Sequence, residues 1–297
     1  MKKIKGSLSK PEPFAIIAAA AISLCVLLPL RVYQVTKLID PETGFYTENN
    51  FTVPLFYILC AVVIAGIAAF SFLSEKAGRT RNIAGRSIPT GVAAGLTALA
   101  VMFDSVYRIY SFIEMNAGYV ETVDFTRMQY LSKSGAAALL LQAVFGILTA
   151  FFLWIYTVSC FTRTPKFSGF AVLSVAPVAW AICRIIVRFV RKISFVNISD
   201  LLLELFMLVF LITFFMAFAQ IVTKVTPEEA AWRLYGCGVP AALLAFLVSV
   251  PRLFLIVIGH SDSLVADYGF NTCDLAVAVF IPLFLYNSAC AKKQADK

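Results

Sequence analysis

Long apolar runs separated by short polar stretches recur along the whole chain. An apolar run of about 20 residues crosses a bilayer as an α-helix, which satisfies its backbone hydrogen bonds internally. The pattern predicts an all-α integral membrane protein with eight transmembrane helices, and seven is the competing count because the last run is short. The predicted helices are Phe14–Leu30, Val53–Leu73, Ile88–Phe112, Gly135–Cys160, Ser168–Phe189, Leu201–Val222, Val239–Ile258 and Leu275–Ala289.

The segments between these helices leave no room for a soluble domain, since none is longer than 22 residues. We therefore expect residues 1–297 to form a single polytopic membrane domain, with all chemistry in or beside the bilayer. No small-x-small cleavage motif follows the first apolar run before Arg31, so we expect this run to stay as the first helix and not to be removed as a signal peptide.

Composition supports the membrane class. The chain is 60% hydrophobic and 14% charged, against about 25% charged in an ordinary soluble domain. Its net charge of +8 collects at helix ends, so it indicates membrane topology and not nucleic-acid binding. Fifteen lysines and arginines fall on the side of the N-terminus and seven on the other side, which predicts cytosolic N- and C-termini in the cell membrane.

Cysteine and histidine usage limits the chemistry further. The seven cysteines are scattered without C-x-x-C spacing, and most lie in or beside apolar runs, where cysteine behaves as a small hydrophobe. His260 is the single histidine, so a multi-histidine metal site or bis-histidine haem cannot be built. We expect no metal, no cofactor and no disulfide framework.

One predicted hairpin, Ala179–Phe206, carries charges where lipid excludes them. Arg184 and Arg188 lie four residues apart on one helix face, and Asp200 and Glu204 do so on the next helix. In an antiparallel hairpin that turns near residue 194, one register sets Arg184 opposite Glu204 and Arg188 opposite Asp200. A charge at the bilayer centre costs about 2.5–3.5 kcal/mol, so these side chains are expected to face inward and to pair.

Other predicted helices carry similar charges near the same side of the membrane. Arg252 and Asp274 would be level in a hairpin that turns near residue 263, and Asp104 and Arg108 lie four residues apart on the third helix. Five arginines face four acids in this set, which favours an anionic solute or lipid headgroup over a cation. The candidate site residues are Arg31, Asp104, Arg108, Arg184, Arg188, Asp200, Glu204, Arg252 and Asp274.

A short signature precedes every second helix and indicates an internal repeat. It reads Asn50-Phe51-Thr52, Asp124-Phe125-Thr126, Asn197-Ile198-Ser199 and Asn271-Thr272-Cys273, at spacings of 74, 73 and 74 residues. The simplest interpretation is four tandem helical hairpins over residues 14–73, 88–160, 168–222 and 239–289. The alternative is that Asn, Asp, Ser and Thr are simply the preferred caps of helices that enter from this side.

Two functional hypotheses follow. The first is a non-enzymatic permease or membrane-embedded binding component for a small anionic solute. The second is a membrane-embedded partner, sensor or scaffold subunit of another membrane protein, whose ion pairs are purely structural. The run Glu228–Arg233 matches EExxxR, which resembles the first motif of the CAAX-type intramembrane proteases, but that family needs two further histidines and this chain has one in all. A capping box at Thr226–Glu229 explains the run better, so we expect no enzyme activity.

Overall fold

The computed structural model describes residues 13–40, 45–48, 50–75, 87–117, 131, 134–162, 171–190, 198–223, 227–259 and 270–295. Within these ranges the fold is all-helical, with one isolated antiparallel bridge between Ile39 and Tyr46. The α-helices are α1 (Pro13–Lys37), α2 (Thr52–Glu75), α3 (Ile88–Ala117), α5 (Ala136–Thr162), α6 (Ala176–Val190), α7 (Ile198–Val222), α8 (Pro227–Ile258) and α9 (Thr272–Ala295), and the 3₁₀ turn η1 (Val172–Val175) leads into α6.

Eight helices among the described residues are long and apolar enough to cross a membrane. The chain is therefore a polytopic membrane protein, as the hydropathy pattern predicts. The last helix extends to Ala295 and is not short, which removes the reason for counting seven.

Several helices differ from the predicted bounds: α6 begins at Ala176, eight residues after Ser168, and α1 and α8 extend furthest beyond their predicted ends. α1 continues seven residues past Leu30 to Lys37, so Arg31 lies inside the helix and not in the loop after it. α8 begins at Pro227, twelve residues before the predicted start at Val239. An apolar run marks the part of a helix that meets hydrocarbon, whereas the helix itself continues into the interface, where polar residues are tolerated.

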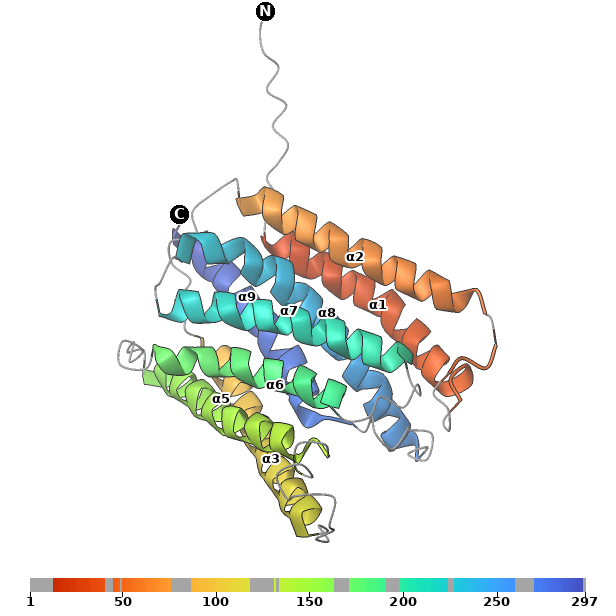
Figure 1. Ribbon diagram of the computed structural model, residues 1–297. Helices are drawn as coiled ribbons and strands as arrows, with labels where there is room; N and C mark the ends of the chain where they lie inside the picture. The colour runs from red at the N-terminus through yellow and green to blue at the C-terminus, as the bar shows by residue number, and fades with distance from the viewer. Residues whose placement is uncertain are drawn as a thin grey trace, which may run out of the picture.

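The helices form a bundle centred on α8 (Figure 1). α8 packs against α1, α2, α7 and α9, while α3 and α5 pack together and join the rest through α9 and α6. In α8 61% of the membrane span is buried inside the protein, against 17% in α2, which places α2 at the periphery. The first residue of α1 and the last residue of α9 lie at the same end of the bundle (Figure 1).

Aromatic rings fill the centre where α5, α7 and α9 meet. Phe218 on α7 is fully buried and contacts Phe280 and Phe284 of α9 edge-on, with ring centroids 5.9 and 5.0 Å apart. Tyr156 of α5 also meets Phe218 edge-on at 5.2 Å. Each such edge-to-face pair stabilises the fold by about 0.5–1.5 kcal/mol in addition to the stabilisation from burial of the rings.

Glycine permits the close approach of α3 and α5. A Cβ atom on Gly91 would lie 2.9 Å from the Cβ of Cys160. A Cβ atom on Gly146 would overlap the Ser105 side chain and lie 3.3 Å from Trp180 Cδ1. Small residues at such positions let membrane helices pack backbone to backbone.

Two of the four repeated signatures can be compared in the structure. The Oδ1 atoms of Asn50 and Asn271 each accept a hydrogen bond from the backbone N–H two residues later, at 3.1 and 2.8 Å. Both asparagines therefore cap the start of their helices, α2 and α9, as the capping alternative expects. The signatures at residues 124–126 and at residue 197 lie outside the described residues, and the repeat stays a prediction.

Candidate functional site

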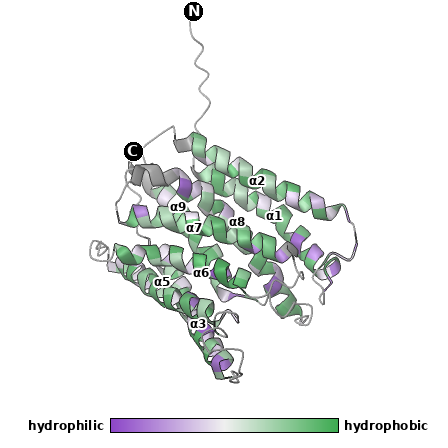
Figure 2. Cartoon of the chain, viewed as in Figure 1, coloured by the Kyte–Doolittle hydropathy of each residue, from purple (hydrophilic) through white to green (hydrophobic). Residues whose placement is uncertain are grey.

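Charged side chains from several helices meet inside the bundle, towards the ends of α1 and α8 and the starts of α7 and α9. Figure 2 shows apolar positions along most of each helix, with hydrophilic positions near the end of α1 and of α3. The charged groups form three sets.

The first set is the Arg31 triad, which consists of Arg31, Asp200 and Arg252. Arg31 of α1 donates to Asp200 of α7, and Arg252 of α8 reaches the other oxygen of the same carboxylate at 3.7 Å. Arg31 and Arg252 are 1% and 4% exposed, and Asp200 is 21% exposed. Two buried guanidinium groups therefore share one carboxylate.

Polar groups from α1, α2 and the segment between them complete the surroundings of Arg31. Its Nη1 atom donates to Gln34 Oε1 at 3.2 Å and to the Tyr46 hydroxyl at 3.1 Å. The Tyr46 hydroxyl lies 3.3 Å from that of Tyr57 on α2. The guanidinium group also lies over the ring of Phe56, 5.6 Å from its centroid.

The second set is the Arg184 tetrad, which consists of Arg184, Arg188, Glu204 and Asp274. Arg184 of α6 donates both terminal nitrogens to Asp274 of α9, at 2.6 and 3.1 Å, and lies 3.4 Å from Glu204 of α7. Arg188 donates to both oxygens of Glu204 at 2.9 Å. Such forked pairing is the strong geometry of arginine and carboxylate.

The Arg184 tetrad contains two arginines and two carboxylates, so its formal charges cancel, and most of it is buried. Arg184, Glu204 and Asp274 are at most 4% exposed, and Arg188 is 23% exposed. The Arg184 guanidinium also lies over the ring of Trp180, at 5.2 Å from its centroid.

The third set is the α3 pair, Asp104 and Arg108. Arg108 donates to Asp104 Oδ1 at 3.3 Å, one turn away on the same helix, and Gln142 of α5 donates to Asp104 Oδ2 at 3.4 Å. Cys273, next to Asp274, donates to the backbone carbonyl of Ala100 at 3.3 Å, which joins α9 to α3 one turn before Asp104.

The pairing differs in part from the predicted register. Arg184 lies beside Glu204 as the hairpin predicts. Arg188 was assigned to Asp200, whereas the structure pairs it with Glu204 and pairs Asp200 with Arg31 and Arg252. Asp274 was assigned to Arg252 but binds Arg184. The basic residues Arg191 and Lys192, which follow Arg188 in the sequence, lie outside the described residues.

Four polar partners were missed in the sequence, namely Gln34, Tyr46, Tyr57 and Gln142. Gln34 lies three residues after Arg31, which is hydrogen-bonding distance on a helix face. Gln142 is an amide inside an otherwise apolar run, and a buried amide requires a partner. Nothing in the sequence pointed to Tyr57.

Across the first two sets, four arginines contact three carboxylates of the described residues, and Arg31 and Arg252 share Asp200. No group of three or more His, Cys, Asp or Glu in the described ranges is arranged to hold a metal ion. Comparison of the chain with protein-family models, curated proteins and solved structures gave no match. The chain is a polytopic membrane protein with buried intramembrane salt bridges.

Proposed function

We propose that this protein is a non-enzymatic permease or membrane-embedded binding component for a small anionic solute, which binds at the Arg31 triad. The observation that carries the proposal is that two buried guanidinium groups, those of Arg31 and Arg252, converge on the carboxylate of Asp200. Two guanidinium groups that converge inside the bundle offer several N–H donors to a carboxylate or phosphate group.

The geometry suggests how binding acts on the helices. Asp200 is the most exposed member of the Arg31 triad, so the triad is accessible on the side of this carboxylate. A carboxylate or phosphate takes the place of Asp200 by accepting from the planar guanidinium groups. Release of Asp200 breaks its ion pairs with Arg31 of α1 and Arg252 of α8, which couples occupancy of the site to the position of the first turn of α7.

The proposed topology is four tandem hairpins in the cell membrane, with both termini in the cytosol. The excess of basic residues in the segments on the N-terminal side supports this orientation. The packing of α1 on α2, α3 on α5, α6 on α7 and α8 on α9 is compatible with four hairpin units. Reporter fusions at the two termini and after residue 120 test the orientation.

A specific observation favours a second candidate, a partner, sensor or scaffold subunit with purely structural ion pairs. The Arg184 tetrad is neutral, and Arg184 already donates to two carboxylates. A satisfied, buried network of this kind fixes the relative positions of α6, α7 and α9 without any ligand.

Thermal unfolding of the purified protein with a panel of anions separates these candidates. Phosphate, sulfate, acetate and a dicarboxylate are the probes, and the variants are Arg252→Gln and, as matched control, Arg108→Gln. We expect at least one anion to raise the melting temperature of the wild type and the control but not of Arg252→Gln. The same anion should enter proteoliposomes if the protein is a permease.

An equal shift in Arg252→Gln rejects the Arg31 triad as the site. No shift and no uptake with any anion favours the structural candidate.

A further inference from the structure

The guanidinium group of Arg31 is held on one side by uncharged acceptors. Its Nη1 atom donates to Gln34 Oε1 at 3.2 Å and to the Tyr46 hydroxyl at 3.1 Å, whereas its Nη2 atom donates to Asp200. Because Nη1 carries two N–H donors, Gln34 and Tyr46 together use both of them. Among the residues that the structure describes, Asp200 is the one carboxylate in contact with Arg31.

The amide of Gln34 is fixed in its orientation by the backbone of α2. Gln34 is fully buried, and its Nε2 atom donates to the backbone carbonyl of Thr52, the first residue of α2, at 3.0 Å. A carbonyl can only accept, so the amide nitrogen must face Thr52 and the amide oxygen must face Arg31. The acceptor beside Arg31 Nη1 is therefore set by the contact of α1 with α2.

Tyr46 reaches Arg31 because the segment after α1 folds back along the end of that helix. The backbone N–H of Thr47 donates to the carbonyl of Leu38 at 2.8 Å, beside the bridge that Tyr46 forms. Both uncharged acceptors of Arg31 thus come from α1 and the segment that follows it, whereas Asp200 comes from α7. Movement of α7 relative to α1 leaves the uncharged acceptors in place.

The buried arginine of α6 is held differently. Both terminal nitrogens of Arg184 donate to Asp274, at 2.6 and 3.1 Å, and Nη2 also lies 3.4 Å from Glu204. Arg31 and Arg184 are 1% and 4% exposed, so the degree of burial does not account for the difference. An amide or hydroxyl satisfies an N–H donor and leaves the charge of the arginine, whereas a carboxylate neutralises it as well.

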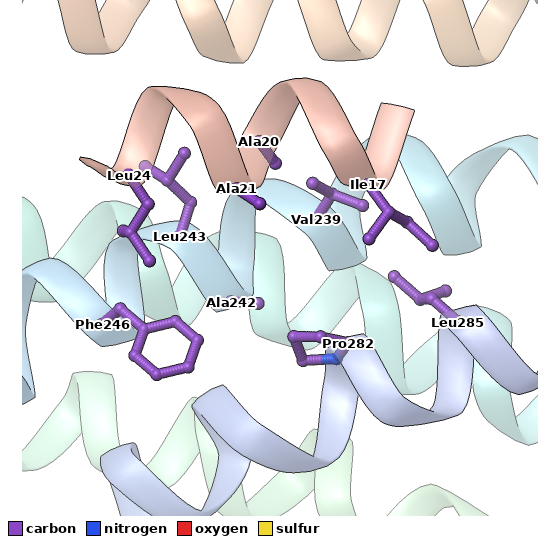
Figure 3. Close-up of a pocket in the computed structure, with 10 residues that line it drawn as sticks. All are labelled: Ile17, Ala20, Ala21, Leu24, Val239, Ala242, Leu243, Phe246, Pro282 and Leu285. Atoms are coloured by element: carbon purple, nitrogen blue, oxygen red, sulfur yellow. The ribbon is translucent and has the colours of Figure 1, made fainter. Parts of the chain in front are cut away.

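The cavity between α1, α8 and α9 does not compete as an anion site. It encloses about 140 Å³, and the side chains that line it are all apolar (Figure 3). Leu24, its last lining residue on α1, lies seven residues before Arg31, about 10 Å along the helix. An anion in this cavity would find no hydrogen-bond donor among the lining side chains.

We propose that Gln34 is a positioning residue of the anion site, which together with Tyr46 holds Arg31 by uncharged hydrogen bonds. These bonds keep Arg31 Nη2 in one orientation, and keep its charge available, for the carboxylate or phosphate that replaces Asp200. The inference rests on the proposed function and adds which edge of the guanidinium group the anion contacts. Donors that are oriented before binding reduce the entropy that binding costs.

The variant Gln34→Glu tests the need for an uncharged acceptor. It keeps the shape of the side chain but places a carboxylate on Arg31 Nη1. We therefore expect the rise in melting temperature that phosphate, sulfate, acetate or a dicarboxylate causes in the wild type to be lost. Asn50→Asp is the matched control, because it adds the same charge two residues before Thr52 and still caps α2. Its shift should equal that of the wild type.

The outcomes separate this inference from the proposed function. A shift that persists in Gln34→Glu overturns the inference alone. Loss of the shift in both Gln34→Glu and Asn50→Asp also overturns it, because the effect is then a general one of negative charge. No shift in the wild type rejects the proposed function and the inference with it.

A second measurement needs no anion. The carboxylate introduced by Gln34→Glu should substitute for that of Asp200, so Asp200→Asn should lower the melting temperature less in Gln34→Glu than in the wild type. Equal losses overturn the inference.

If Gln34→Glu does not fold, Gln34→Met removes the acceptor without adding charge. The anion concentration at half of the maximal shift should then rise about two- to tenfold, since Arg31 loses part of its orientation before binding. A residue with a purely structural role would lower the melting temperature and leave this concentration unchanged, and that result overturns the inference.

Discussion

The pair of Arg184 and Asp274 provides the sharpest test of the charged network. Removal of Asp274 alone leaves the Arg184 tetrad with two arginines on one carboxylate, and removal of Arg184 alone leaves Asp274 without its arginine while Glu204 keeps Arg188. Removal of both leaves Arg188 paired with Glu204, which is neutral. The variants Arg184→Gln, Asp274→Asn and their combination should therefore be strongly non-additive.

Two estimates give the size of this coupling. Breaking one side of a buried ion pair costs about 3–5 kcal/mol, and the lower end applies because Glu204 still compensates Arg184 in part. Interhelical hydrogen bonds in membranes average about 0.6 kcal/mol and are about doubled when both partners are charged. The two bonds at 2.6 and 3.1 Å then contribute about 2.4 kcal/mol together. We expect a coupling energy of about 2–3 kcal/mol.

The assay is unfolding in mixed micelles with increasing SDS, followed by tryptophan fluorescence. Trp180 is a local reporter, since its ring lies 5.2 Å from the Arg184 guanidinium. The same cycle on Asp104 and Arg108 is the control, because this pair lies one turn apart on a single helix and is more exposed. Its coupling should be about 0.5 kcal/mol. A coupling for Arg184 and Asp274 no larger than that of the control would refute the reasoning.

Three further substitutions test the packing and the surroundings of Arg31. Gly146→Val should destabilise the contact of α3 with α5 by about 1–3 kcal/mol, whereas Gly66→Ala, which faces open space, should not. Phe218→Ala empties the aromatic centre and should cost about 3–5 kcal/mol in the SDS titration. Tyr46→Phe removes an acceptor of Arg31 and should cost about 0.5–1.5 kcal/mol by the same measurement; no change means that the hydroxyl is dispensable.

Hydropathy predicts the helices of this chain because every segment that crosses hydrocarbon must be apolar and must satisfy its backbone hydrogen bonds internally. The same pattern places Arg184 beside Glu204, since their helices are consecutive and only seven residues separate Val190 from Ile198, which limits the register of the two helices. It cannot place Arg31 beside Asp200, which are 169 residues apart, or Arg184 beside Asp274, which are 90 apart. Those contacts depend on which helices become neighbours, and the residue types alone do not determine this.

The helix α7 connects the two main charged sets within a single turn. Asp200 and Glu204 lie four residues apart, yet Asp200 binds arginines of α1 and α8 while Glu204 binds arginines of α6. A purely structural network requires both carboxylates to stay in place. A binding site at the Arg31 triad requires Asp200 to leave its arginines while Glu204 keeps its own.

The variant Asp200→Asn distinguishes these cases. It removes the carboxylate that Arg31 and Arg252 share, so it should destabilise the protein by about 3 kcal/mol in either case. In a binding component, an anion takes over the vacated position, so the anion that stabilises the wild type should stabilise Asp200→Asn by more degrees. If the protein is a structural subunit, no anion restores the stability of Asp200→Asn, because the guanidinium groups of Arg31 and Arg252 are inaccessible to solutes. Glu204→Gln is the matched control, since it removes the other α7 carboxylate without changing the Arg31 triad. If anions restore both variants equally, they act by general screening and not at the Arg31 triad.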